Sequence, residues 1–155
     1  MKLKIATPAA AAAIASLRVA TAEQLTAVHG TGPWSGNITE KGVLFNMRQG
    51  AVYVLRQRKK IIATLTLSTR KPFAIDRKFL SASKHPIYLT AMAVVPELQR
   101  QGIGRHCVDE AKKIDKRWLG DVICLDAYDA AAGAGEFYGR CGFREVGPRR
   151  IAVCR

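Results

Sequence analysis

The stretch Gln99-Arg100-Gln101-Gly102-Ile103-Gly104 joins two segments of different hydrophobic period. Before it, residues 87–95 are almost all apolar, which is typical of a strand covered on both faces. After it, apolar residues recur at the spacing of one helix face: Ile103, Cys107, Ala111, Ile114 and Trp118. A junction of this kind presents free backbone N–H groups and the positive end of a helix dipole. Because Gly102 and Gly104 allow close approach to the backbone, the junction is a candidate phosphate site.

The junction does not match the commoner phosphate-binding motifs. It lacks the G-x-G-x-x-G pattern of dinucleotide-binding folds and the Lys-Ser/Thr end of a P-loop. Arg100 and Arg105 add side-chain charge beside the glycines. A G-x-G at a helix start is also common as a purely structural turn, so the junction alone leaves its ligand open.

A second motif follows after one more strand. Residues 121–127 read as a buried strand, and residues 131–141 as a helix that contains Tyr138 and is closed by Gly142. Tyr138 lies 34 residues (138 − 104) after Gly104, an interval that holds one helix, one strand and a turn. Both helices then follow adjacent parallel strands, and ligands bind at the carboxyl ends of such strands. Tyr138 is predicted to lie in that crevice, although an isolated tyrosine is more often a packing aromatic.

The first half of the chain and its end predict mostly antiparallel pairing. Period-two alternation, turn residues and candidate caps predict a strand at 1–7, a helix at 9–28 and a loop at 29–37. A second helix follows, capped by Asn37 or Thr39 and running to Arg48, and then a hairpin of 51–57 with 60–69. An irregular basic tract at 70–86 has room for a short helix, and a final hairpin of 143–146 with 150–154 turns through Gly147-Pro148. The whole predicts a mixed sheet.

Together the two motifs resemble those of the GNAT superfamily of acyl-CoA-dependent N-acyltransferases. The family's pyrophosphate loop, Q/R-x-x-G-x-G/A, is matched at 99–104 and follows a hydrophobic-Val-x-Pro match at 93–96, and its Y-x-x-x-G-F ending is matched at 138–143. The resemblance covers residues 88–146, whereas the first 80 residues agree only in the order of strands and helices. It implies one N-acetyltransferase domain over 1–155, of α/β (α+β) class, with a central mixed, mostly antiparallel sheet, a splayed pair of parallel strands and flanking helices.

The resemblance also implies acetyl-CoA as a cosubstrate and no metal. The pantetheine arm would pair with the backbone of Met92 and Val94, with Ala93 between them. The pyrophosphate would sit on the amides of six residues: Arg100, Gln101, Gly102, Ile103, Gly104 and Arg105. Many members carry an asparagine seven residues before the tyrosine. Here that residue is Ala131, so one cofactor contact is missing or is replaced, for example by Asp129.

The expected chemistry assigns two side chains. Tyr138 matches the family's general-acid tyrosine, and a phenol with a pKa near 10 is a competent proton donor to a departing thiolate. A backbone N–H at about Val94 would polarise the thioester carbonyl. Asp126 stands where some members carry a catalytic glutamate, so it is the candidate base, acting through a water or holding the substrate's ammonium. The structural alternative is a strand-end aspartate that caps the following turn.

Composition limits the class of protein. The chain has 155 residues, 48% of them apolar, which fits one globular domain, and it has no apolar run long enough to span a membrane. Its four cysteines include no C-x-x-C pair, which excludes a zinc knuckle or ribbon and predicts free thiols in a reducing cytoplasm. With 25 Lys and Arg against 12 Asp and Glu, the net charge is +13, which favours an anionic partner.

The acceptor is predicted to be a small-molecule primary amine. Two alternatives stay open: a macromolecular amine (a protein N-terminus, a lysine or a charged tRNA, which the positive charge mildly favours) and a non-catalytic domain that senses acyl-CoA. The acceptor cleft is expected between the first two helices, the Gly30–Asn37 loop around Trp34, and the tract at 70–86. The C-terminal hairpin offers an exposed strand through which two copies could pair as a homodimer.

Overall fold

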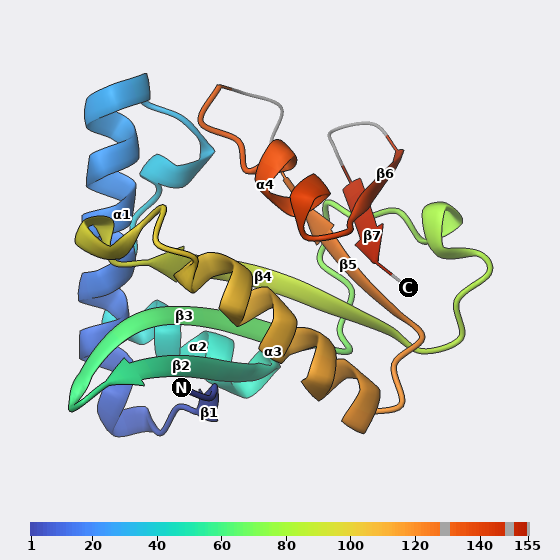
Figure 1. Ribbon diagram of the computed structural model, residues 1–155, viewed down its shortest axis with the longest axis horizontal. Coiled ribbons are helices and arrows are strands. Elements are labelled where there is room, and N and C mark those ends of the chain that lie inside the picture. The colour runs from blue at the N-terminus through green and yellow to red at the C-terminus, as the bar shows by residue number, and fades with distance from the viewer. Residues whose placement is uncertain (128–130, 148–150, 155) are drawn as a thin grey trace.

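A seven-stranded sheet runs through the centre of the computed structural model, which describes residues 1–127, 131–147 and 151–154 (Figure 1). Its order is β1-β2-β3-β4-β5-β7-β6, and every neighbouring pair is antiparallel except β4 with β5. This confirms the predicted mixed, mostly antiparallel sheet with one parallel pair. The strands are β1 Lys4–Ile5, β2 Ala51–Gln57, β3 Lys60–Ser68, β4 Pro86–Val94, β5 Val122–Asp126, β6 Arg144–Gly147 and β7 Ile151–Cys154.

Helices cover both faces of this sheet. In Figure 1, α1 and α2 lie behind it, whereas α3 crosses in front of it. The α-helices are α1 Ala11–His29, α2 Glu40–Gln49, α3 Ile103–Arg117 and α4 Gly135–Arg140, and four short 3-10 turns accompany them: η1 Pro8–Ala10, η2 Pro33–Ser35, η3 Arg77–Leu80 and η4 Pro96–Leu98. No helix in the described part of the chain is both long enough and apolar enough to cross a membrane.

Two predicted caps are present, one at the start of α2 and one at the end of α4. Thr39, rather than Asn37, caps α2, since its hydroxyl accepts a hydrogen bond from the Gly42 amide at 3.1 Å. Gly142 follows α4 with a φ of +88°, as expected of a C′ glycine.

Two predicted elements are shorter in the structure. The predicted helix at 131–141 begins only at Gly135, because Gly133 and Gly135 are poor helix formers at its start. The predicted strand at 1–7 is reduced to the two residues of β1. The turn of the final hairpin, Pro148 to Arg150, lies outside the described residues.

Strand β3 lies in the middle of the hydrophobic core. It is buried continuously from Ile61 to Leu67, because α1 packs on one face and α3 on the other. All four cysteines are free, as predicted, and three of them are buried. Burial raises the pKa of the Cys107 and Cys124 thiols to about 12, so both stay protonated and unreactive at neutral pH.

The parallel strands β4 and β5 diverge towards their carboxyl ends. They pair only from Pro86 to Tyr88 on β4, whereas β4 continues for six more residues to Val94. On the other side of β4, two residues, Ala91 and Met92, oppose the single Leu65 of β3, since Thr64 pairs with Ala93 and Thr66 with Thr90. This β-bulge, with Ala91 at a φ of +50°, bends β4 away from β5.

The segment 70–86 lies over the β5–β7 side of the sheet. Its Ile75 and Leu80 are buried with Tyr88 and Val122 in a second, smaller cluster. The prediction that this segment walls the acceptor cleft is therefore wrong: it lines neither of the two cavities described below. Its buried side chains, Ile75 and Leu80, instead cover a part of the sheet around β5 and β7.

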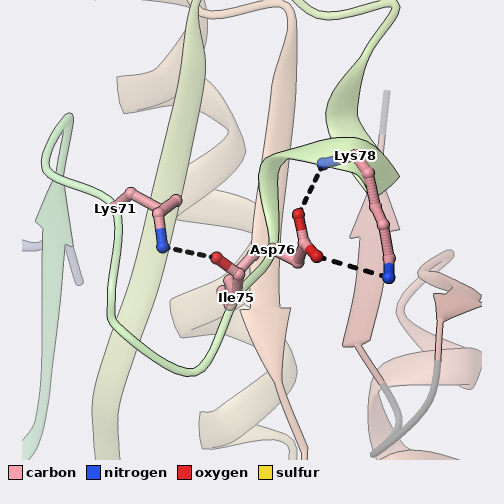
Figure 2. A network of polar contacts seen from close by, with 4 residues as sticks. All are labelled: Lys71, Ile75, Asp76 and Lys78. Atoms are coloured by element: carbon pink, nitrogen blue, oxygen red, sulfur yellow. Dashed lines mark hydrogen bonds and ion pairs between the residues drawn. The ribbon is translucent and has the colours of Figure 1, made fainter.

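Polar contacts within this segment hold its loop together (Figure 2). The Lys71 ammonium donates to the Ile75 carbonyl at 2.6 Å. The Asp76 carboxylate accepts a hydrogen bond from the Lys78 amide at 3.0 Å and pairs with the Lys78 ammonium at 3.3 Å. These contacts cap η3 and close the loop on itself.

Asp121 ties the end of the segment to the start of β5. Its carboxylate accepts hydrogen bonds from the Ser83 hydroxyl, from the Lys84 amide at 2.7 Å and, more weakly, from the His85 amide at 3.3 Å. The hydrogen bond from Ser83, followed by those from the two amides, lowers the pKa of Asp121 below its ordinary value. The charged carboxylate therefore stabilises the fold.

We expect Asp121→Asn to lower the free energy of unfolding at pH 7 by about 1 kcal/mol, the low end for a charge-assisted site because the carboxylate is partly exposed. Since the folded-state pKa is depressed, the wild-type advantage is present above the unfolded-state pKa and is lost as the pH falls through the folded-state value. Urea unfolding at pH 7 and pH 3 measures it. Asp109→Asn, at an exposed position with no hydrogen bond or ion pair among the described residues, is the control. Equal destabilisation at both pH values would contradict the assignment.

Candidate functional site

A cavity of about 630 Å³ opens where β4 and β5 diverge. Its walls come from the bulged half of β4, the junction leading into α3, the end of β5, and α4 with the turn before it. Two α1 residues complete it, Thr21 and Leu25. The site therefore forms at the carboxyl ends of two adjacent parallel strands, where open α/β sheets bind ligands.

The structure brings most of the predicted site residues together in this cavity. Those that line it are Met92, Ala93, Val94, Arg100, Gly102, Gly104, Arg105, Asp126 and Tyr138. Gln101 and Ile103 are absent from the lining. The Gln101 side chain instead donates to the Glu97 carbonyl at 3.0 Å, and Ile103 packs against the core.

The amino-terminal end of α3 gives one end of the cavity a positive character. Within the described part of the chain no side chain caps this helix, so its first amides have no side-chain cap there. Arg100 and Arg105 line the cavity beside them, and the Arg105 guanidinium reaches across to the Arg140 carbonyl at 3.3 Å. Unsatisfied amides, the helix dipole and two cations together suit an anionic ligand.

The two glycines of the junction are needed for different reasons. Gly102 has a φ of +83°, in the left-handed region, and open space around it. Gly104 has an ordinary backbone, but a Cβ there would lie 3.1 Å from Phe137 Cζ and 3.5 Å from Met92 Cε. Gly102 thus shapes the turn, whereas Gly104 lets α3 approach α4.

Gln99, the first residue of the junction, anchors it to β4. Its side-chain amide donates to the Val94 carbonyl at 3.1 Å, and the Thr21 hydroxyl of α1 lies 3.3 Å from the same oxygen. The Val94 carbonyl is therefore satisfied by the protein. The contact fixes α1, the bulged strand and the junction relative to one another.

Tyr138 projects from α4 towards the bulged strand. Its ring packs edge-on against Phe137 at 5.0 Å and Phe143 at 5.5 Å between centroids, which restricts its orientation. Its hydroxyl lies 3.7 Å from Met92 Sδ on β4. The phenolic proton is therefore held within the wedge between α4 and β4.

Asp126 is the last residue of β5 and is exposed, with its neighbours Leu125 and Ala127 buried. It lines the same cavity as Tyr138. Ala131, which stands in the place of the family's asparagine, is exposed and does not line the cavity, whereas Ala132 and Ala134 do. Asp129, the suggested replacement contact, lies outside the described residues.

A second cavity of about 460 Å³ adjoins the first. It is lined by α1, α2 and the η2 loop with Trp34, as predicted for the acceptor cleft. The two cavities share residues at the bulge and on α1: Ala91, Met92, Ala93, Thr21 and Leu25. Ligands bound in the two cavities would therefore lie next to each other at the bulge of β4.

The sequence predicted α1 beside the second of the two cavities but did not reveal that α1 also lines the first. Thr21 and Leu25 face both, and Arg18 lines the second. A signal for Arg18 was present, since it lies at helical spacing from Ile14 and Ala11 on the face that predicts burial. An arginine on an apolar helix face is unusual, because a buried guanidinium needs a hydrogen-bond acceptor or an anion as its partner.

Comparison with known proteins identifies the family of this arrangement. A family model described as an acetyltransferase (GNAT) domain matches residues 48–145. The comparison with curated proteins found no match.

Solved structures share the whole fold at low sequence identity. A PaiA N-acetyltransferase from Thermoplasma acidophilum in complex with coenzyme A is 13% identical with a TM-score of 0.73, over 98% of this chain and 95% of that chain. The ribosomal-protein-S18-alanine N-acetyltransferase of Escherichia coli is 17% identical with a TM-score of 0.67, over 98% and 88%. An aminoglycoside 6'-N-acetyltransferase from Acinetobacter haemolyticus is 18% identical with a TM-score of 0.67, over 95% and 93%. At these identities the likeness shows the fold, and these relatives differ in the acceptors that their names give.

We expect Gly102→Ala to lower the free energy of unfolding by about 1 kcal/mol, because alanine is strained at a φ of +83° although nothing obstructs its methyl group. Chemical denaturation measures the change. Gly139→Ala is the matched control, since it also meets no neighbour but lies within α4. That control should leave stability unchanged or raise it by up to about 1 kcal/mol. Equal effects of the two substitutions would show that the turn does not need glycine.

Proposed function

The chain belongs to the GNAT acetyltransferase family, and from that premise we propose that it is an acetyl-CoA-dependent N-acetyltransferase acting on a primary amine of a small molecule. The observation that carries the proposal is a single cavity lined by the cationic junction, the bulged strand, Tyr138 and Asp126. We propose further that residues 1–155 form one N-acetyltransferase domain, because one core cluster contains both Leu3 and Ala152.

The residues of the first cavity suit coenzyme A. The uncapped helix end with Arg100 and Arg105 would hold the pyrophosphate. The backbone from Met92 to Val94 would pair with the pantetheine arm, and because the Val94 carbonyl is already bonded, Val94 would contribute its N–H. When bound, acetyl-CoA supplies an acyl thioester, whose carbonyl the same N–H would polarise.

The chain's own residues would move the two protons of the transfer. A primary amine is protonated at neutral pH and attacks only after losing a proton, which Asp126 would accept directly or through a water. As the nitrogen–carbon bond forms and the carbon–sulfur bond breaks, Tyr138 would donate its hydroxyl proton to the departing sulfur. The second proton that the nitrogen loses on becoming an amide would pass through solvent and restore the Tyr138 hydroxyl. The position of that hydroxyl 3.7 Å from Met92, on the strand that would carry the thioester, supports this role.

A macromolecular acceptor is the second candidate, and the net charge of +13 is the observation that favours it, through an RNA-borne amine. The acceptor cavity of about 460 Å³ supports a small molecule instead.

Calorimetric titration with acetyl-CoA should show saturable binding, and release of CoA thiol should then depend on an added small amine. Binding without turnover across a broad amine panel would favour an acyl-CoA sensor. Turnover confined to aminoacyl-tRNA or peptide substrates would favour the macromolecular acceptor. Absence of acetyl-CoA binding by the folded protein would overturn the proposal.

We expect Tyr138→Phe to lower kcat by about 100-fold or more, because general acid catalysis contributes 10²–10⁴ and phenylalanine preserves the ring packing. KM for acetyl-CoA should change little. Steady-state kinetics of CoA release measures both. Tyr88→Phe is the matched control: this tyrosine lies on β4, is only 2% exposed, and lines neither cavity. Unchanged kcat in Tyr138→Phe with every amine tested would remove Tyr138 from the chemistry.

A further inference from the structure

Arg18 is a buried cation without a counter-ion in the described part of the chain. It lies on the inner face of α1, and only 8% of its surface is exposed. Its one hydrogen bond there runs from Nη2 to the Thr66 hydroxyl at a long 3.4 Å, and its buried Nε donates to nothing. None of the ion pairs among the described residues includes it.

Such an arrangement is costly for the protein alone. Burial lowers the pKa of Arg18 from its ordinary value, yet an arginine keeps its charge at neutral pH. An unpaired buried charge is destabilising unless an anion compensates it, and a long apolar side chain would fill the same space at lower cost. The guanidinium therefore fits a site whose anion comes from outside the chain.

The place where that anion would bind is the second cavity, which Arg18 lines. No aspartate or glutamate among the described residues belongs to that lining, and the other polar side chains there are neutral, including Asn37 and Asn46. The described lining thus offers one positive charge and no negative charge, so a cationic group has no counter-ion there that would hold it away from the bulge. It also meets the first cavity at Ala91 to Ala93, where the acetyl group would be presented.

We propose that this cavity binds a carboxylate through Arg18, and that the acceptor is therefore a small amine that also carries a carboxylate. The inference rests on the proposed function for the identity of the reacting group, but not for the binding of the anion. A guanidinium pairs with a carboxylate through two parallel hydrogen bonds, which would occupy the donors now left over. A single carboxylate charge matches the single cation, whereas a phosphate monoester carries nearly two negative charges at neutral pH.

The first experiment compares amines that differ only in this group. Free α-, β- and γ-amino acids are assayed beside their primary amides, with O-phosphoethanolamine beside ethanolamine. At least one acid should exceed its amide in kcat/KM by about tenfold or more, which corresponds to ~1.4 kcal/mol. Amides used as well as or better than acids, as a peptide N-terminus would be, overturn the proposal. So does a preference for the phosphate.

Variants of Arg18 separate recognition from a structural role. Arg18→Met should raise KM for the acids at least about tenfold, leave the amides unchanged and preserve the Kd for acetyl-CoA, and Arg18→Lys should restore part of the loss. Arg56→Met, at an exposed position on the β2–β3 hairpin, is the matched control and should change none of these. The melting temperature of Arg18→Met should not fall, because an uncompensated buried charge has been removed. Equal losses for acids and amides with a lower melting temperature would show that Arg18 is structural.

A binding measurement on the wild-type protein keeps the test independent of catalysis. Butanoate, at concentrations where butanamide has no effect, should raise the melting temperature of the wild type and not that of Arg18→Met. Carboxylate-specific stabilisation without any amine turnover would support the anion site and refute the proposed function. Turnover of amines with no carboxylate-specific stabilisation or preference would support the proposed function and overturn this inference.

Discussion

The separation of β4 from β5 is the constraint on which the rest of the structure depends. A parallel pair that stayed hydrogen-bonded to its carboxyl end would leave no room between the strands. Here pairing with β5 stops at Tyr88, and the bulge at Ala91 bends β4 away from β5 while β4 stays paired with β3. The core tolerates this departure because Gln99 and Thr21 bond the Val94 carbonyl from outside the sheet. The same contacts hold the α3 junction and α1 at the mouth of the wedge.

One strand thereby serves two cavities. The wedge side of β4 meets the cationic junction, Tyr138 and Asp126, and the α1 side meets the cavity that contains Arg18. An acyl donor and an acceptor approaching from these two sides would meet at Ala91 to Ala93, the residues of β4 that line both cavities. The positive charges to which we assign a ligand in the two cavities are those of Arg18, Arg100 and Arg105, whereas most of the net charge of +13 lies elsewhere on the chain.

Local signals explain which elements were predictable. Thr39, Gly142 and the apolar stripe of α3 act through contacts within a few residues, so their positions followed from the sequence. The position of segment 70–86 was predicted wrongly because its packing partners are distant in the sequence. Ile75 and Leu80 pack against Tyr88 and Val122, and the basic, irregular sequence of the segment does not predict these partners. The separate roles of Gly102 and Gly104 likewise needed the position of Phe137.

The sequence by itself determined the order of elements, the mixed sheet and the family, because hydrophobic period, turn residues and short motifs are local properties. Only the tertiary structure decided where β4 bends, that α1 reaches both cavities, and that Arg18 is buried opposite Thr66 with no ion pair to another described residue. The physical reason is that burial and charge pairing depend on which distant segments meet. The sequence does not show whether water or a protein core surrounds a cationic side chain. The free energy of placing the charge differs between the two environments by several kcal/mol.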